Sequence, residues 1–467
     1  MMAHPGDLSM HAPVTGALPS ALIGGRLWSN GPGWTWIGDR LAHPFDGHGY
    51  LRRFTFTESG IQLDARFVNT PAYQAESAAG RMIYRGMATN ISDRFWDNMG
   101  ITGPPRNVAN TTVVPWNGHI LAGWEGGAPH AVDPTTLHTV GEYTFGGSIA
   151  GQTSLAHMYT DPSCDSLLLC SIRMGRRTTV TFREVAPDET VTRSRTAEMP
   201  SLAFAHDFAF TKDWYVLGGN PISMKPFALA QMAMGTGTLM QALRTDLRRP
   251  GELVLISRHR DAPPRRVPLP GPAFVVHFAN AFERDDALIV DACLFSRFSF
   301  GGEFGYTGPH SPLDPALPEA RGPQKLVRIT IPHDDTAASW QPLVPHGVDF
   351  PRVDPAYNGK DAPFLLGATR ADTRYSDPFD SIIRVDLQAP HSHTLWTAPD
   401  GQFVGEPIGI QGADGEHIVA LLSDGVRQHT TVAVFNADTL SDGPIATAQL
   451  PLLPVAFHGE WQPPPRD

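Results

Sequence analysis

Short runs of apolar and β-branched residues, separated by turns rich in Asp, Gly and Pro, recur along the whole chain. In TTVVPWNGHILAGWE (111–125), two such runs flank WNG, which predicts a β-hairpin. Similar runs occupy 166–174, 286–295, 381–387, 417–424 and 430–440. Strands this frequent predict an all-β sandwich, barrel or propeller. The size of the chain and the number of strands favour the propeller.

One segment departs from this pattern. ISMKPFALAQMAMGTGTLMQALR (222–244) is rich in Met, Leu and Ala and has few charges, which predicts a helix. Two interpretations of it stay open. The helix caps a β core, or it presents an exposed apolar patch that contacts a membrane surface or forms the mouth of a tunnel.

Composition and charge exclude several classes of protein. The 467 residues carry a formal net charge of −11 and no block of basic residues, so nucleic acid is not an expected partner. The first twenty residues show no secretion signal, and no apolar run has the length of a membrane-spanning helix. The three cysteines lack paired spacing, which indicates neither a disulfide framework nor a thiolate metal site. We therefore expect a cytoplasmic protein.

Four histidines lie within or beside apolar segments, where an unpaired imidazole is costly to bury. They are His157, His206, His277 and His458. A buried neutral imidazole is either satisfied by hydrogen bonds or used as a metal ligand, and for any single histidine the hydrogen-bonded core residue is the better interpretation. No two of the four share a local metal-binding motif. A propeller brings such distant residues together, because the innermost strand of each blade lines one axis.

The residues around these histidines resemble the motifs of the carotenoid cleavage oxygenase family. The matching segments are AHMYTDP (156–162), AHDFAFT (205–211), VHFANAFE (276–283) and FHGEWQP (457–463). Further matches are NGPG (30–33), PFDGHGYLRRF (44–54), RMIYRG (81–86) and FVGEPIG (403–409). They follow the family's order and cover nearly the whole chain.

The resemblance implies one domain over 1–467, a seven-bladed β-propeller with a dome of loops and short helices above the metal axis. It implies Fe(II) on that axis, bound by one histidine from each of four blades. Matched motif by motif, the ligands are His157, His206, His277 and His458. Imidazole suits iron(II), and four neutral ligands leave the full charge of the ion and open coordination positions for O2.

The family supports three of these ligands with carboxylates that accept the other ring N–H. The matching positions are Glu125, Asp349 and Glu406. Asp349 is one methylene shorter than the family's glutamate. A displaced backbone, a bridging water or a weakened contact with His277 are the open possibilities. His48 also replaces an acidic residue of the family's pattern, and we expect it in an early turn with no effect on function.

The implied activity is that of a non-haem iron dioxygenase, which cleaves a conjugated C=C bond of an apocarotenoid with O2 to give two carbonyl products. The alternative is cleavage of a stilbene or phenylpropenoid. The family members that cleave such phenols resemble one another in having a lysine at the position of Trp124. A retinoid-type isomerohydrolase and a metal-free binding scaffold are further alternatives. Trp124, Phe204 and Phe350 are candidates for the tunnel wall, and plain core packing fits each equally well. We name no catalytic side chain beyond the metal ligands. An apolar polyene comes from lipid, so we expect peripheral contact with the inner face of a membrane through 222–244.

Overall fold

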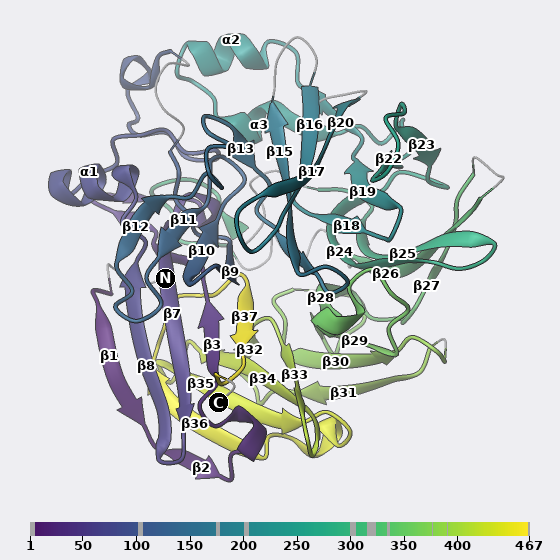
Figure 1. Ribbon diagram of the computed structural model, residues 1–467. Coiled ribbons are helices and arrows are strands. Elements are labelled where there is room, and N and C mark those ends of the chain that lie inside the picture. Colours follow the sequence, from purple (N-terminus) through teal and green to yellow (C-terminus); the bar gives the residue numbers. More distant parts are fainter. Residues whose placement is uncertain are drawn as a thin grey trace.

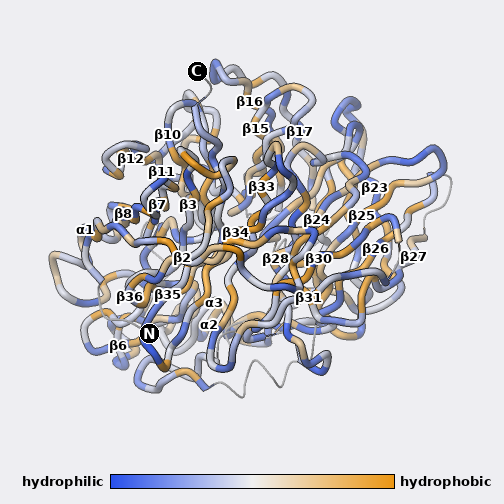
Figure 2. Tube along the Cα trace, turned by 90° about the horizontal axis from the view of Figure 1, so that it is seen from below, coloured by the Kyte–Doolittle hydropathy of each residue, from blue (hydrophilic) through white to orange (hydrophobic). Residues whose placement is uncertain are grey.

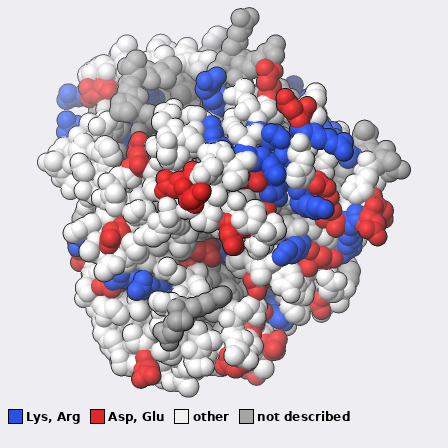
Figure 3. Space-filling model, in the orientation of Figure 1, with Lys and Arg blue, Asp and Glu red and all other residues white. Residues whose placement is uncertain are grey.

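Seven antiparallel β-sheets are arranged around a common axis in a computed structural model of the chain (Figure 1). The structure describes residues 5–100, 106–173, 178–199, 205–298, 305–314, 324–333, 337–375, 377–389 and 391–465. The expected seven-bladed propeller is confirmed. Charged side chains of both signs lie over the face shown in Figure 3, with a group of basic side chains toward its upper right.

The first blade in the chain joins both ends of the sequence. From its outer to its inner edge it contains β1 (Leu8–Ala12), β8 (Gly60–Phe67), β7 (His48–Thr57), β3 (Arg26–Ser29) and β37 (Gly459–Gln462), and β4 (Pro32–Trp34) also pairs with β7. The last blade contains β2 (Val14–Gly16), β36 (Ala446–Pro451), β35 (His429–Asn436), β34 (Gly415–Asp424), β33 (Ile408–Gly412) and β32 (Gln402–Val404). Because β1 and β2 lie in neighbouring blades and β37 pairs with β3, backbone hydrogen bonds between the two ends of the chain close the ring.

The other five blades are consecutive in sequence. One contains β9 (Thr112–Trp116), β10 (His119–Gly123), β11 (His130–Val132) and β12 (Thr139–Glu142). The next contains β13 (Thr153–Ser154), β14 (Tyr159–Asp161), β15 (Ser166–Arg173), β16 (Thr178–Val185) and β17 (Val191–Met199). Then come β18 (Phe208–Phe210), β19 (Trp214–Gly219), β22 (Glu252–Ser257) and β23 (Arg265–Pro268). The last two are β24 (Phe274–Glu283), β25 (Ala287–Phe295), β26 (Lys325–Pro332) and β27 (Ser339–Pro342), followed by β28 (Val348–Arg352), β29 (Phe364–Thr369), β30 (Ser381–Asp386) and β31 (His393–Thr397). The short pairs β5 (Trp36–Ile37) with β6 (Arg40–Leu41) and β20 (Ile222–Met224) with β21 (Leu243–Thr245) lie outside the blades.

The apolar pattern of each strand follows its place in a blade. All nine residues of β25 are buried, as expected of a strand covered on both faces, whereas the outer strand β17 alternates between half-buried and exposed residues over most of its length. Neighbouring blades pack face to face through large side chains. Phe182 of β16 stacks on Tyr215 of β19 with ring centroids 4.2 Å apart, a contact worth about 1 kcal/mol beyond burial alone.

The hairpin predicted at WNG is confirmed. Strands β9 and β10 pair antiparallel, with Trp116 opposite His119. Asn117 and Gly118 both have positive φ, at 45° and 75°, which is the backbone that a two-residue hairpin turn needs. Asn and Gly are the residues that adopt it at least cost.

The single helix expected over 222–244 is wrong. The segment begins and ends in the paired strands β20 and β21, and only α2 (Ala228–Ala233) and α3 (Leu239–Ala242) between them are helical. Gly235, with a φ of 74°, follows α2, and Thr238 starts α3 with a capping box to Gln241. The other helices in the described ranges are α1 (Pro71–Ala79), η1 (Ser20–Leu22), η2 (Pro44–Asp46), η3 (Phe95–Asn98), η5 (Pro355–Tyr357) and η6 (Leu440–Asp442). Among the described residues, no helix is long and apolar enough to cross a membrane.

The early turn expected at His48 is wrong, because His48 begins β7, where it is fully buried. Its Nε2 is 2.7 Å from Glu76 Oε2, and Arg106 Nη2 donates to the same oxygen at 2.7 Å. Burial by itself raises the pKa of Glu76, but the hydrogen bond with His48 and the charge of Arg106 outweigh it and lower the pKa to about 2. This buried cluster joins α1 to the first blade.

The depressed pKa of Glu76 predicts a pH-dependent stability. Since the folded pKa of about 2 lies below the usual 4.5, the stabilisation is complete above pH 4.5 and is lost as the pH falls toward 2. A difference of this size corresponds to about 3 kcal/mol. Denaturant unfolding at a series of pH values should therefore show the Glu76→Gln variant losing about 3 kcal/mol less stability than the wild type over this window. Parallel curves for the two proteins would refute the cluster's role.

Candidate metal centre

Four histidine side chains meet on the propeller axis. His157 and His206 come just before the inner strands β14 and β18, His277 lies within β24, and His458 directly precedes β37. His206 Nε2 is 3.2 Å from His157 Nε2 and 3.1 Å from His277 Nε2. One ring nitrogen from each of the four residues lies within 4.8 Å of the others. The four belong to four different blades, as the resemblance implies.

Three carboxylates accept hydrogen bonds from the ring nitrogens that face away from the axis. His206 Nδ1 donates to Glu125 Oε1, His277 Nδ1 donates to Asp349 Oδ1 at 2.6 Å, and His458 Nδ1 donates to Glu406 Oε1 at 3.0 Å. Glu125, Asp349 and Glu406 come from the three blades that supply no histidine. A carboxylate only accepts hydrogen bonds, so each proton is held at Nδ1 and each Nε2 lone pair is free to face the axis.

The shorter side chain of Asp349 reaches His277 directly. The pairing of β28 with β29 is irregular between Asp349 and Arg352, and Phe350 has a φ of 50°. Such a bulge re-aims the side chains beside it. Of the three possibilities left open by the sequence, the structure therefore shows the displaced backbone, with a direct contact of 2.6 Å between Asp349 and His277.

Burial and the neighbouring charges shift the pKa values of His157, His458 and His277 in different directions. Burial lowers the pKa of His157 well below its usual value, and the positive charges of the other three histidines add to this effect. Burial also lowers the pKa of His458. For His277, the Asp349 carboxylate outweighs burial and raises the pKa.

The three carboxyl groups behave alike. Burial alone raises the pKa of each, but the group that bonds to it outweighs burial: His206 for Glu125, His277 for Asp349, and Arg352 with His458 for Glu406. The net pKa of each lies below its usual value, so all three remain ionised. Four imidazole donors with three carboxylates behind them fit a divalent transition-metal ion.

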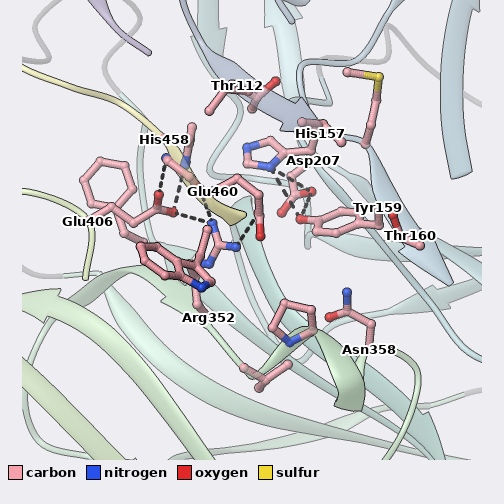
Figure 4. Close-up of a pocket in the computed structure, with 18 of the residues that line it drawn as sticks. Thr112, His157, Tyr159, Thr160, Asp207, Arg352, Asn358, Glu406, His458 and Glu460 are labelled. Atoms are coloured by element: carbon pink, nitrogen blue, oxygen red, sulfur yellow. Dashed lines mark hydrogen bonds and ion pairs between the residues drawn. The ribbon is translucent and has the colours of Figure 1, made fainter. Parts of the chain in front are cut away.

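A cavity of about 270 Å³ opens beside the histidines (Figure 4). Its lining includes Thr112, Tyr159, Asp207, Arg352, Asn358 and Glu460. Trp461 and Pro463, at the end of β37 and just after it, also line it. In Figure 2, α2 and α3 lie in the lower half of the view, away from β10 and β15, whose neighbours β9 and β14 contribute Thr112 and Tyr159 to the lining.

Arg352 is a residue of this site that the sequence analysis did not single out. Its Nη1 donates to Gly459 O and its Nη2 to Glu460 Oε2, each at 2.7 Å, and Nη1 lies 3.5 Å from Glu406 Oε1. It thus balances the negative charge behind His458. The only signal in the sequence was its position three residues after Asp349 in VDFPRVDP.

The three tunnel candidates have different surroundings. Phe350 packs between His277 and His458, with ring centroids 5.7 and 5.2 Å from theirs. Trp124 is buried, and its ring covers Gly126 so closely that a Cβ there would clash with it. Phe204 lies outside the described residues.

Comparison with known proteins extends over the whole chain. The family model described as retinal pigment epithelial membrane protein, of the carotenoid oxygenase family, matches residues 3–463. The apocarotenoid-15,15'-oxygenase of Synechocystis sp. is 31% identical, covering 96% of this chain and 92% of the relative. The chloroplastic carotenoid cleavage dioxygenase 7 of Oryza sativa is 30% identical, covering 96% and 87%.

More distant relatives include enzymes named for isoeugenol, resveratrol and lignostilbene. The isoeugenol monooxygenase of Pseudomonas putida is 25% identical over 96% of this chain and 94% of the relative. Among solved structures, a point variant of the Synechocystis apocarotenoid oxygenase superposes with a TM-score of 0.90 and 27% identity, covering 99% of this chain and 97% of the other. By sequence and by fold, the chain belongs to the carotenoid oxygenase family.

Proposed function

We propose that His157, His206, His277 and His458 bind one Fe(II) ion, and that the protein cleaves a conjugated C=C bond of an apocarotenoid with O2. The observation that carries this proposal is the convergence of four Nε2 atoms, three of them backed by a carboxylate at Nδ1. When bound, the ion supplies O2 activation, and the cleaved bond yields two carbonyl products. The chain's own residues hold four neutral ligands in place and keep their protons on the outer nitrogens.

The substrate class follows from the relatives and from the side chains near the centre. The two most similar curated relatives named above act on apocarotenoids or carotenoids. Phe350 offers an aromatic face beside two of the histidines. The buried Trp124, next to Glu125, occupies the position at which the phenol-cleaving members share a lysine. Both side chains favour an apolar polyene over a phenol, and we propose both as parts of the tunnel wall, together with Phe204.

Substrate incubation tests this proposal. Iron-loaded protein is incubated under O2 with apocarotenals and, separately, with a hydroxystilbene, and the aldehydes formed are identified by mass. We expect aldehydes from the apocarotenals. Cleavage of the stilbene alone would favour the phenol-cleaving alternative, for which the isoeugenol monooxygenase is the relative. Formation of an isomerised alcohol without O2 would favour an isomerohydrolase.

An apolar patch supports contact with a membrane. It consists of Phe95, Trp96, Met99, Phe227, Leu229 and Met234, whose exposed fractions run from 47% to 84%. The patch joins η3 to α2, because Gly100 N donates to Ala233 O at 3.0 Å and Gly235 lies against the backbone of Phe95. Exposed apolar side chains gathered in this way mark a contact surface. We propose that it docks the protein on the inner face of a membrane, in the cytoplasm, where an apolar substrate dissolves.

Removing two aromatic side chains of the patch should weaken this contact. Each large apolar side chain withdrawn from lipid costs about 1.5–3 kcal/mol, so the double variant Phe227→Ser, Trp96→Ser should bind phosphatidylcholine vesicles at least about tenfold more weakly in co-sedimentation. Val426→Ser is the matched control, because Val426 is 84% exposed in the turn between β34 and β35, outside the patch. Equal binding by the two variants would exclude the patch as the docking surface.

A further inference from the structure

Within the part of the chain that the structure describes, no carboxylate bonds directly to His157. The nearest carboxylate oxygen to His157 Nδ1 is Asp207 Oδ1, at 3.9 Å. Between them lies the hydroxyl of Tyr159, which is 3.5 Å from His157 Nδ1 and 2.7 Å from Asp207 Oδ1 (Figure 4). The rings of His157 and Tyr159 are nearly parallel, at 19°, with centroids 6.0 Å apart.

The chemistry of the three groups fixes the direction of these contacts. The Asp207 carboxylate only accepts hydrogen bonds, so the Tyr159 hydroxyl donates its single proton to it. The hydroxyl oxygen then has lone pairs free to accept from His157 Nδ1–H. His157 is thereby held as the same tautomer as the other three histidines, with the lone pair of Nε2 facing the axis.

Asp207 also ties together the strands that carry the neighbouring histidines. Its Oδ1 accepts a hydrogen bond from Phe208 N at 2.6 Å, and its Oδ2 accepts one from Phe278 N at 2.8 Å. Phe208 begins β18, two residues after His206, and Phe278 follows His277 in β24. The side chain is almost completely buried, at 1% exposed, so the three bonds are not shared with solvent.

We propose that Tyr159 and Asp207 form a relay that positions His157 for metal binding, with Asp207 fixing its spacing from His206 and His277. The inference rests on the proposed metal centre. It gives the fourth histidine the support that Glu125, Asp349 and Glu406 give to the others, but through a neutral hydroxyl. His157 therefore receives less negative charge than its three neighbours.

The variant Tyr159→Phe tests the relay, because it removes the hydroxyl and keeps the ring. Co(II) serves as the probe: its visible absorption reports the ligand field, and its affinity is measured by titration of metal-free protein. Loss of such a supporting partner typically weakens metal binding by about 10–100-fold. We expect a change within that range together with an altered Co(II) spectrum.

Tyr215→Phe is the matched control. Tyr215 is fully buried and, like Tyr159, donates to a carboxylate, Glu184 Oε1, at 2.6 Å, but it does not line the cavity beside the histidines. Both variants should lower the melting temperature of the metal-free protein, whereas only Tyr159→Phe should change the affinity and spectrum of Co(II). Asp207→Asn should weaken binding at least as much as Tyr159→Phe.

Two outcomes separate this inference from the metal centre itself. If the wild type binds one Co(II) and Tyr159→Phe binds it with the same affinity and spectrum, the relay is refuted and the metal centre stands. If the wild type binds no stoichiometric Co(II), or binds it equally well without His206, the metal centre is refuted and the relay with it. Should Asp207→Asn fail to fold, Tyr159→Phe alone decides.

Discussion

Replacing His206 by alanine is expected to abolish stoichiometric metal binding. His206 Nε2 lies between the Nε2 atoms of His157 and His277, at 3.2 and 3.1 Å, so its loss opens the middle of the ligand set. It also leaves Glu125 without the proton donor that offsets its burial. Since loss of a mere supporting partner costs about 10–100-fold in metal affinity, loss of a ligand should cost more than about 100-fold. Metal analysis of the dialysed protein and Co(II) titration would measure the effect.

A histidine away from the axis provides the control. His393 of β31 contacts His346 at a ring distance of 5.2 Å and takes no part in the four-histidine cluster. His393→Ala should bind metal as the wild type does. If His206→Ala retained one ion per chain with unchanged affinity, the four histidines would be ordinary core residues, and the protein would be better described as a binding scaffold.

Replacing Glu406 by alanine should weaken both the metal site and the fold. Glu406 accepts hydrogen bonds from His458 Nδ1 at 3.0 Å and from Gly459 N at 2.7 Å, and it lies 3.5 Å from Arg352 Nη1. The variant loses the group that orients His458, so metal affinity should fall by about 10–100-fold. It also leaves Arg352 with one carboxylate partner, Glu460, instead of two. Losing one of these two carboxylates should appear as a lower free energy of unfolding in denaturant titrations.

Glu460→Gln separates these two effects. Glu460 bonds to the same Arg352 at 2.7 Å but to no histidine of the centre, so this variant should lose stability while metal affinity changes little. Glu406→Gln keeps the shape of the side chain but removes its charge, and it should resemble Glu406→Ala in metal affinity. Unchanged iron content and Co(II) affinity in both Glu406 variants would overturn the role assigned to Glu406.

Local patterns in the sequence predicted the parts of the structure that depend on neighbouring residues. The strands at 111–125 and 286–295 follow from short apolar runs, and the turn between β9 and β10 follows from Asn117 and Gly118. The prediction of one helix over 222–244 was wrong. It rested on the helix propensity of the whole segment, in which Gly235 and Thr238 interrupt the helix. The turn expected at His48 was wrong, because β7 begins at this residue, where its side chain pairs with Glu76 of α1.

The candidate site shows the same division. The motifs around the four histidines pointed to them as metal ligands by resemblance, and other motifs pointed to Glu125, Asp349 and Glu406 as the supporting carboxylates. Tyr159 and Asp207 both lie within those motifs, but no sequence feature indicated their hydrogen bond. They are 48 residues apart, and only the packing of two neighbouring blades brings them together.

The sequence by itself determined the strand-rich class, the family and which four histidines are proposed as metal ligands. Only the tertiary structure decided that these histidines meet, that Asp349 reaches His277, and that Arg352 balances the charge behind His458. The physical reason is the closed ring. Hydrogen bonds between β3 and β37 join residues more than four hundred positions apart, and this closure fixes the inner strands of all seven blades around one axis. Distances of 3 Å between side chains from different blades depend on that closure and on no local pattern.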